Sequence, residues 1–129
     1  MKRKILIVED NVSLSQRQKD WFEQAGYDAM TAMNEPAARA LIRKHQFDLI
    51  LSDVRLPEGN GISLLEWLKK EKRDIPFIIT TEYVSVPDVV RTIKLGAKDY
   101  LPKPVHREHL LELAEEIFRP LATVRTKPK

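Results

Sequence analysis

The chain has no cysteine among its 129 residues, which excludes disulfides and thiolate chemistry. Its three histidines, His45, His106 and His109, lack the spacing of a zinc site. No apolar run approaches the roughly 20 residues that a membrane span needs, and the basic start of the chain is followed by only four aliphatic residues before Glu9. We therefore expect neither a signal peptide nor a membrane anchor, and a reducing cytoplasm is compatible with this composition.

Acidic residues are missing from the basic end of the chain. The net charge is +3, but four of the 22 basic residues lie in the last eleven positions, where no acid occurs. Residues 1–118 therefore carry 18 basic and 19 acidic side chains. A protein that binds the phosphate backbone needs a basic stripe on its folded body, so direct nucleic-acid contact by this domain is not expected. Residues 120–129 are predicted to form a basic linker or tail.

Short apolar runs alternate with longer segments of helical period, a pattern typical of repeated β-α units around a parallel sheet. The expected strands cover residues 4–8, 27–32, 47–52, 77–80 and 98–101. Asn34 and Ser85 are expected to cap the second and fourth helices, and Gly26 and Gly96 to end the first and fourth. Right-handed crossovers then favour an α/β fold, a doubly wound (βα)5 flavodoxin-like parallel sheet with strand order 2-1-3-4-5.

Polar residues follow four of these strands. Glu9 and Asp10 follow the first, Asp53 the third, Thr81 the fourth and Lys103 the fifth. In doubly wound sheets ligands bind at the carboxyl ends of the strands, where the strand order reverses. A single Asp or Thr after a strand is usually a helix cap or a turn former, but that reading does not explain the whole set.

This set of residues indicates a phosphoryl-transfer site. Carboxylates together with phosphate oxygens suit Mg²⁺, and a carboxylate can accept a phosphoryl group when cations offset the repulsion between negative charges. We interpret Asp53 as the nucleophile, Lys103 as the cation that holds the phosphoryl oxygens and Thr81 as a hydroxyl donor.

Three segments carry a resemblance to a known family: 5–11 (Ile-Leu-Ile-Val-Glu-Asp-Asn), 53–57 (Asp-Val-Arg-Leu-Pro) and 96–104 (Gly-Ala-Lys-Asp-Tyr-Leu-Pro-Lys-Pro). Over about residues 3–120 the chain resembles the receiver (CheY-like) domains of two-component response regulators, most closely those of the NtrC type. The resemblance implies a receiver domain over residues 1–119. The linker or tail at 120–129 would lead to an output domain, through which the protein would regulate transcription.

The resemblance also implies a chemistry. Asp53 would accept a phosphoryl group from a sensor histidine kinase, with Mg²⁺ held by Asp10, Asp53 and the backbone carbonyl of Arg55, and with Glu9 acting through a metal-bound water. The domain would assist only its own phosphorylation and dephosphorylation, so it would be a regulator and not an enzyme.

Further implications concern the output. Thr81 would turn toward the phosphoryl oxygens while Tyr100 swings inward. These movements would reshape the face made by the fourth helix, the fifth strand and the fifth helix, where an output domain or a downstream protein would bind. A homodimer is a possible assembly. The peptide bond between Lys103 and Pro104 would be cis.

Some positions depart from the family pattern. Glu82 stands where a small residue is usual and could repel phosphodonors, Asn60 replaces a frequent aspartate but can still cap the third helix, and Arg55 could influence hydrolysis of the acyl phosphate. Tyr83 is either a switch aromatic or a packing residue. Trp67 has a helical spacing that places it at a surface edge.

Two rival functions follow from these features. A phosphatase with an aspartyl intermediate would usually place a general acid two residues after the nucleophile, and Arg55 occupies that position. No Gly-x-x-x-x-Gly-Lys loop is present, so a P-loop nucleotide hydrolase is excluded. A phosphorylation-independent binding module with the same fold remains the alternative, because of Glu82.

Overall fold

Strands and helices alternate throughout residues 2–119, the part of the chain that the computed structural model describes. The strands are β1 (Lys4–Val8), β2 (Asp28–Ala32), β3 (Leu49–Asp53), β4 (Phe77–Thr81) and β5 (Asp99–Pro102). The helices are α1 (Val12–Gln24), α2 (Glu35–Lys44), α3 (Gly61–Lys70), α4 (Val86–Lys94) and α5 (Arg107–Phe118). The predicted linker or tail at 120–129 lies outside the described residues.

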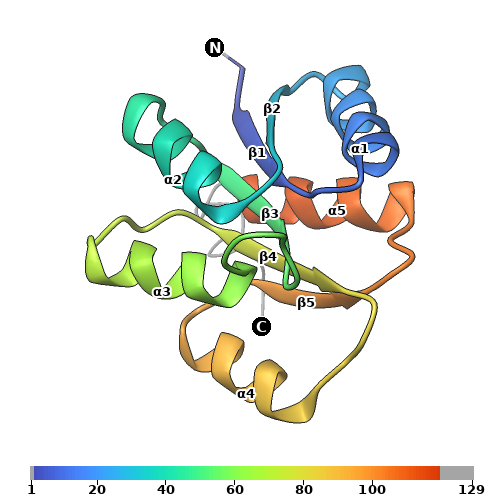
Figure 1. Cartoon of the computed structure of the whole chain (residues 1–129). Coiled ribbons are helices and arrows are strands. Elements are labelled where there is room, and N and C mark those ends of the chain that lie inside the picture. Colours follow the sequence, from blue (N-terminus) through green and yellow to red (C-terminus); the bar gives the residue numbers. More distant parts are fainter. Residues whose placement is uncertain (1, 120–129) are drawn as a thin grey trace, which may run out of the picture.

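The five strands form one parallel sheet in the order β2-β1-β3-β4-β5. This confirms the predicted fold class and strand order. Helices α1 and α5 cover one face of the sheet, and α2, α3 and α4 cover the other (Figure 1). The strand order reverses between β1 and β3, whose register pairs Val8 with Ser52. The residues that follow Val8 and Ser52 therefore emerge next to each other at the carboxyl edge.

Alternate residues of the central strands belong to two hydrophobic clusters, one on each face of the sheet. In β1, Leu6 and Val8 join the cluster under α2 and α3, while Ile5 and Ile7 join the cluster under α1 and α5. All four side chains are fully buried, and each such burial stabilises the fold by about 1.5–3 kcal/mol. The strand ends at the carboxyl edge are therefore held on a rigid support.

Asparagine side chains fix where three of the helices begin. Asn11, Asn34 and Asn60 each accept a hydrogen bond from the backbone N–H three residues ahead, at 3.0, 2.8 and 2.7 Å. Such caps satisfy donors that the helix itself cannot. The caps expected at Asn34 and Asn60 are confirmed, and Ser85 caps α4 as expected, through a longer bond of 3.4 Å.

Two sequence expectations need correction. Strand β3 covers Leu49–Asp53 instead of 47–52, and β4 covers Phe77–Thr81 instead of 77–80, so Asp53 and Thr81 are the last residues of their strands. Trp67 was expected at a surface edge, but it is only 9% exposed. Arginine side chains from neighbouring segments cover its ring, a packing that helical spacing within α3 cannot reveal.

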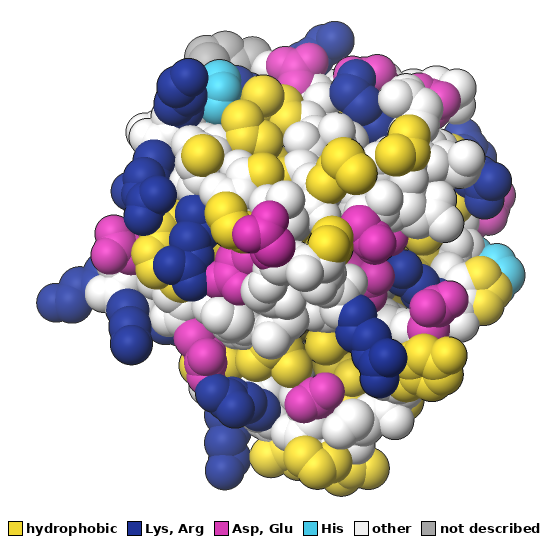
Figure 2. Space-filling model, viewed as in Figure 1, with side chains coloured by type: hydrophobic (Ala, Val, Ile, Leu, Met, Phe, Trp, Pro, Cys, Tyr) yellow, Lys and Arg dark blue, Asp and Glu magenta, His cyan; other side chains and the backbone are white. Residues whose placement is uncertain are grey.

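Hydrophobic side chains also remain outside the core. They gather over α4, at the lower edge of Figure 2, where Val86, Val90 and Ile93 are 72%, 46% and 64% exposed. Within residues 2–119 no helix is long and apolar enough to cross a bilayer.

Candidate functional site

Three carboxylates meet at the carboxyl edge of the sheet. Glu9 and Asp10 follow β1 directly, and Asp53 ends the neighbouring strand β3. One oxygen from each lies within 4.8 Å of the others. Glu9 and Asp53 are buried while Asp10 is exposed, so the group is open to solvent on one side only.

Lys103 joins this group from β5. Its Nζ lies 2.9 Å from Glu9 Oε1 and 2.9 Å from Asp53 Oδ2. Its backbone N–H donates to the Thr81 carbonyl at 2.7 Å, which fixes the start of the segment after β5. The peptide bond between Lys103 and Pro104 is cis, as expected. Residues separated by up to 94 positions thus form one cluster, because their strand ends share one edge.

The charges within this cluster do not balance. Burial holds the pKa of Glu9 above its ordinary value, although hydrogen bonds from Lys103 and the Asn11 backbone oppose this. Burial alone would lower the pKa of Lys103, but its hydrogen bonds to Glu9 and Asp53 and their charges raise it. Lys103 therefore stays an ammonium at neutral pH, and this one cationic group lies beside three carboxyl groups.

A cluster with three carboxyl groups and one ammonium fits a divalent cation. Hard oxygen ligands are what Mg²⁺ prefers, and it commonly uses one or two carboxylates and keeps several waters. Glu9, Asp10 and Asp53 supply clustered carboxylate oxygens, and exposed Asp10 leaves room for water on the open side. The donor set therefore fits Mg²⁺. Arg55, the remaining expected contributor, lies two residues beyond Asp53 in the loop between β3 and α3.

Thr81 and Tyr100 are the expected switch residues, and within residues 2–119 neither side chain forms a hydrogen bond with the carboxylate cluster. Thr81 is 2% exposed, and its hydroxyl donates to the Tyr83 carbonyl at 3.0 Å and accepts from the Tyr83 N–H at 3.1 Å. Within residues 2–119 no hydrogen bond links Thr81 to Asp53. The Tyr100 hydroxyl is buried and has no partner among the same residues, a situation that costs about 1–3 kcal/mol.

The loop after β4 is linked to the loop after β3 by a contact that the sequence did not indicate. The Arg55 guanidinium lies 4.8 Å from the centre of the Tyr83 ring, close enough for a cation–π attraction. Tyr83 is 65% exposed, so it is not a core packing residue. The two loops that flank Asp53 are thereby held together.

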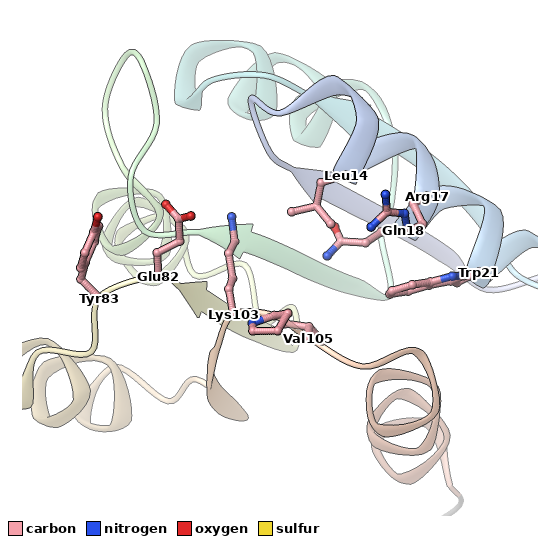
Figure 3. A pocket seen from close by; sticks show the side chains of 9 residues that line it. Leu14, Arg17, Gln18, Trp21, Glu82, Tyr83, Lys103 and Val105 are labelled. Carbon is pink, nitrogen blue, oxygen red and sulfur yellow. The ribbon is translucent and has the colours of Figure 1, made fainter.

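A groove of about 490 Å³ opens beside Lys103. Side chains of α1, including Leu14, Gln18 and Trp21, form one wall, and the segment after β5 forms the other (Figure 3). Glu82 is exposed and points the same way as Lys103 in this view. The Glu82 carboxylate is therefore placed to meet anything that approaches Lys103 along the groove.

Glu35 is a residue that the sequence reasoning missed. It is 4% exposed, and its carboxylate accepts from the Asn60 N–H at 3.1 Å, the Ser63 hydroxyl at 3.1 Å and Arg39 Nε at 3.0 Å. It therefore ties the loop between β3 and α3 to α2. The spacing of Glu35 and Arg39 along α2 was a visible signal of a local pair, but the bonds to the loop were not visible.

Two glycines let this loop pack closely. Gly59 has a φ of 77°, and a Cβ there would collide with the Glu35 side chain. A Cβ at Gly61 would collide with the backbone carbonyl of Asp53. Larger residues at either position would push the loop away from the carboxylates.

Comparisons with known proteins agree with this geometry. The sequence model of the response regulator receiver domain matches residues 5–115. The chain is 32% identical over 118 residues to the response regulator protein PilR of Pseudomonas aeruginosa, covering 92% of this chain and 26% of PilR. It is 38% identical over 112 residues to the transcriptional regulatory protein ZraR of Salmonella typhimurium, covering 87% of this chain and 25% of ZraR. The polar-differentiation response regulator DivK of Brucella anthropi is 35% identical over 114 residues, which cover 87% of this chain and 93% of DivK.

Solved structures show the same similarity. A CheY-like receiver domain protein from Methanospirillum hungatei superposes with a TM-score of 0.86 at 33% identity, covering 90% of this chain and 93% of that one. The non-phosphorylated HemR receiver domain from Leptospira biflexa superposes with a TM-score of 0.85 at 34% identity, covering 99% of each chain. The chain thus spans about a quarter of PilR and ZraR but nearly all of DivK and of these two structures.

Proposed function

Because the chain belongs to the family of response regulator receiver domains, we propose that it is the phosphoacceptor switch of a two-component phosphorelay. The family consists of regulatory domains that interact with histidine kinases and output domains. The expected resemblance to this family is confirmed, and ZraR and PilR, which are NtrC-like, are among the relatives.

The observation that carries the proposal is the position of Lys103. Its ammonium bonds to both Glu9 and Asp53 in a cluster of three carboxyl groups. Receiver domains bind Mg²⁺ at such an acidic pocket. In this chain Glu9, Asp10, Asp53 and the Arg55 carbonyl would hold the ion, and the bound ion would offset the repulsion between Asp53 and an incoming phosphoryl group.

Phosphoryl transfer then follows from the properties of the side chains. An oxygen of Asp53 bonds to phosphorus as the bond from phosphorus to the kinase histidine breaks, and the imidazole leaves with that electron pair. Lys103 keeps its proton and donates to a phosphoryl oxygen in place of one of its present carboxylate partners. The domain acts on itself only, so it is a regulator and not an enzyme proper.

The output step uses Thr81 and Tyr100. When the phosphoryl group is attached to Asp53, the Thr81 hydroxyl leaves the Tyr83 backbone and donates to a phosphoryl oxygen. The loop after β4 then moves, and the buried Tyr100 hydroxyl gains room to find a partner. The change reaches the face made by α4, β5 and α5, where Val86, Val90 and Ile93 are already exposed (Figure 2). An output domain or downstream protein would bind there, or a second copy would form a homodimer.

The wider setting is also a proposal. Residues 1–119 are the receiver domain, and residues 120–129 are a basic linker to an output domain that controls transcription. The match to only a quarter of PilR and ZraR supports this division. The sensor histidine kinase would be the phosphodonor and the cytoplasm the compartment. The domain itself would contact neither nucleic acid nor membrane.

The test is intact-mass measurement after incubation with Mg²⁺ and a small acyl-phosphate donor. We expect one added phosphoryl group in the wild-type chain, and none in Asp53→Asn or in the presence of a chelator. Addition to Asp53→Asn would contradict the assignment of the acceptor.

Glu82 favours one alternative, a receiver-fold binding module that works without phosphorylation. Its exposed carboxylate lies at the groove beside Lys103 and could repel small donors. If the wild-type chain takes up no phosphoryl group, beryllofluoride binding and a kinase donor are tested next. Failure of both would make the phosphorylation-independent module the better function.

A further inference from the structure

Three arginines surround the ring of Trp67. The guanidinium carbons of Arg39, Arg43 and Arg73 lie 5.0, 5.1 and 5.8 Å from the ring centre. Arg39 and Arg43 come from α2, and Arg73 from the segment between α3 and β4. These contacts, together with packing of Trp67 in the hydrophobic core, leave the residue only 9% exposed. We call these four residues the Trp67–arginine face.

This face has more positive charge than its neighbours neutralise. Arg39 pairs with Glu35, but Arg43 and Arg73 form no ion pair within residues 2–119. Guanidiniums drawn to one ring repel each other, and their mutual repulsion falls when an anion binds between them. Lys and Arg side chains gather over α2 and α3, at the left of Figure 2.

The chemistry of a guanidinium on an aromatic ring suits carboxylate binding. An arginine can stack on the ring through its flat face and still use N–H groups at its edge for a two-point hydrogen bond to a carboxylate. The ring also holds the side chain in place, so less conformational entropy is lost when a ligand binds. Arg43 is exposed and Arg73 is half-buried, so both can be reached from solvent.

A shallow groove of about 480 Å³ adjoins the face. Arg39 and Arg43 line it together with Ser63 and two glutamates, Glu35 and Glu58. The groove supplies space for a peptide backbone beside the two arginines. The two glutamates give the groove a mixed charge, and a continuous phosphate backbone needs an uninterrupted basic stripe. A short peptide needs only a few carboxylates, which can bind the arginines at the edge of the groove.

We propose that the Trp67–arginine face is a docking surface for an acidic segment of a partner protein, whose carboxylates bind Arg43 and Arg73. This surface lies on α2 and α3, apart from the α4-β5-α5 face. It does not depend on phosphorylation of Asp53, so it would hold even if the proposed switch function failed.

The test uses the fluorescence of Trp67. A Trp21→Phe background leaves Trp67 as the one tryptophan, since the chain has two. Hexaglutamate is titrated at an ionic strength of about 0.15 M, at which diffuse attraction between exposed charges is largely screened. We expect a saturable change in emission, and we expect the double variant Arg43→Gln with Arg73→Gln to bind at least about tenfold more weakly.

Matched controls come from α2 and α3. Lys44 and Lys70 are exposed and form no cation–π pair with Trp67 within residues 2–119, so Lys44→Gln with Lys70→Gln should weaken binding less than about twofold. Arg43→Lys keeps the charge but loses the flat guanidinium, and it should bind hexaglutamate more weakly than the wild type. Circular dichroism checks that each variant is folded.

Four results would overturn the proposal. No change in Trp67 emission with hexaglutamate would show that the peptide does not bind at this face. Equally weakened binding of hexaglutamate in the arginine and lysine variants would mean that the peptide is attracted by overall positive charge and not by specific contacts with Arg43 and Arg73. Displacement of hexaglutamate by an equal concentration of tripolyphosphate would indicate a general anion site. Sedimentation equilibrium tests whether a second copy of the chain is the occupant, since α5 carries four exposed glutamates. Self-association of the wild type that is lost in Arg43→Gln would show that it is.

Discussion

The buried carboxylate of Glu35 and the three carboxyl groups of the site differ in how many cationic partners they have. Glu35 bonds to Arg39, to the Asn60 N–H at the end of the loop between β3 and α3, and to the Ser63 hydroxyl in the first turn of α3. At the site, Glu9 and Asp53 share the ammonium of Lys103, and Asp10 completes the cluster of carboxyl groups. Glu35 has one cationic partner for its one carboxylate, whereas the site has one ammonium for three carboxyl groups.

The difference separates a structural carboxylate from a reactive one. A buried charge that has all its hydrogen bonds holds its surroundings in place, and removing it leaves partners unpaired. A group of carboxylates with too few cations is poised to bind a metal ion and to exchange partners when a phosphoryl group arrives. Four predictions follow from this contrast.

The largest effect is expected when the one cation of the site is removed. Lys103→Met should lower the rate of phosphoryl uptake by about a hundredfold to a thousandfold, as loss of a preorganised charge donor does in other transfer sites. The rate is measured by intact mass against time with an acyl-phosphate donor and Mg²⁺. Lys98→Met, an exposed lysine next to β5, is the control and should be unchanged. A loss of less than tenfold in Lys103→Met would remove Lys103 from the transfer step.

A divalent cation should stabilise the fold by offsetting the repulsion between the carboxyl groups of the site. Mg²⁺ at about 100 times its Kd should raise the free energy of unfolding by about 2.7 kcal/mol, measured by urea denaturation with and without chelator. Asp10→Asn should reduce this gain, because it removes one ligand, while Glu58→Gln in the neighbouring loop should retain it. An equal gain from Na⁺ at the same ionic strength would indicate general screening and count against a built site.

The same chemical change should have opposite effects in the two groups. Glu35→Gln should lower the free energy of unfolding by about 2 kcal/mol, since it weakens bonds to a buried, satisfied carboxylate. Asp53→Asn should raise it by about 1 kcal/mol in metal-free buffer, since it relieves repulsion among like charges. Both values come from urea denaturation at pH 7. Destabilisation by Asp53→Asn of the size seen for Glu35→Gln would show that the two groups are alike.

The smallest effect concerns the contact between the two loops. The attraction between Arg55 and Tyr83 should contribute about 0.5–1 kcal/mol, measured as the coupling energy in a double-mutant cycle of Arg55→Gln and Tyr83→Leu. Because Tyr83 also holds the Thr81 hydroxyl through its backbone, we expect loss of this contact to favour beryllofluoride binding slightly. Zero coupling would mean that the loops are held by other contacts.

Much of this architecture could be predicted from local patterns. The apolar runs identified all five strands, and the asparagine caps placed the starts of α2 and α3, because each depends on residues within a few positions of one another. The predicted boundaries of β3 and the predicted exposure of Trp67 were wrong. Both properties depend on neighbouring segments of the fold and not on local sequence alone. The bonds of Glu35, the position of the Thr81 hydroxyl and the contact between Arg55 and Tyr83 were not predicted.

The sequence by itself determined which chemical groups end the strands: three carboxylates, a hydroxyl and an ammonium. Parallel strands bring such ends to one edge, so the candidate site followed from the order of the strands. Only the tertiary structure decided which carboxylates are neutralised. That depends on distances between segments up to 94 residues apart, and Coulomb energies in a partly buried site change strongly over a few ångströms.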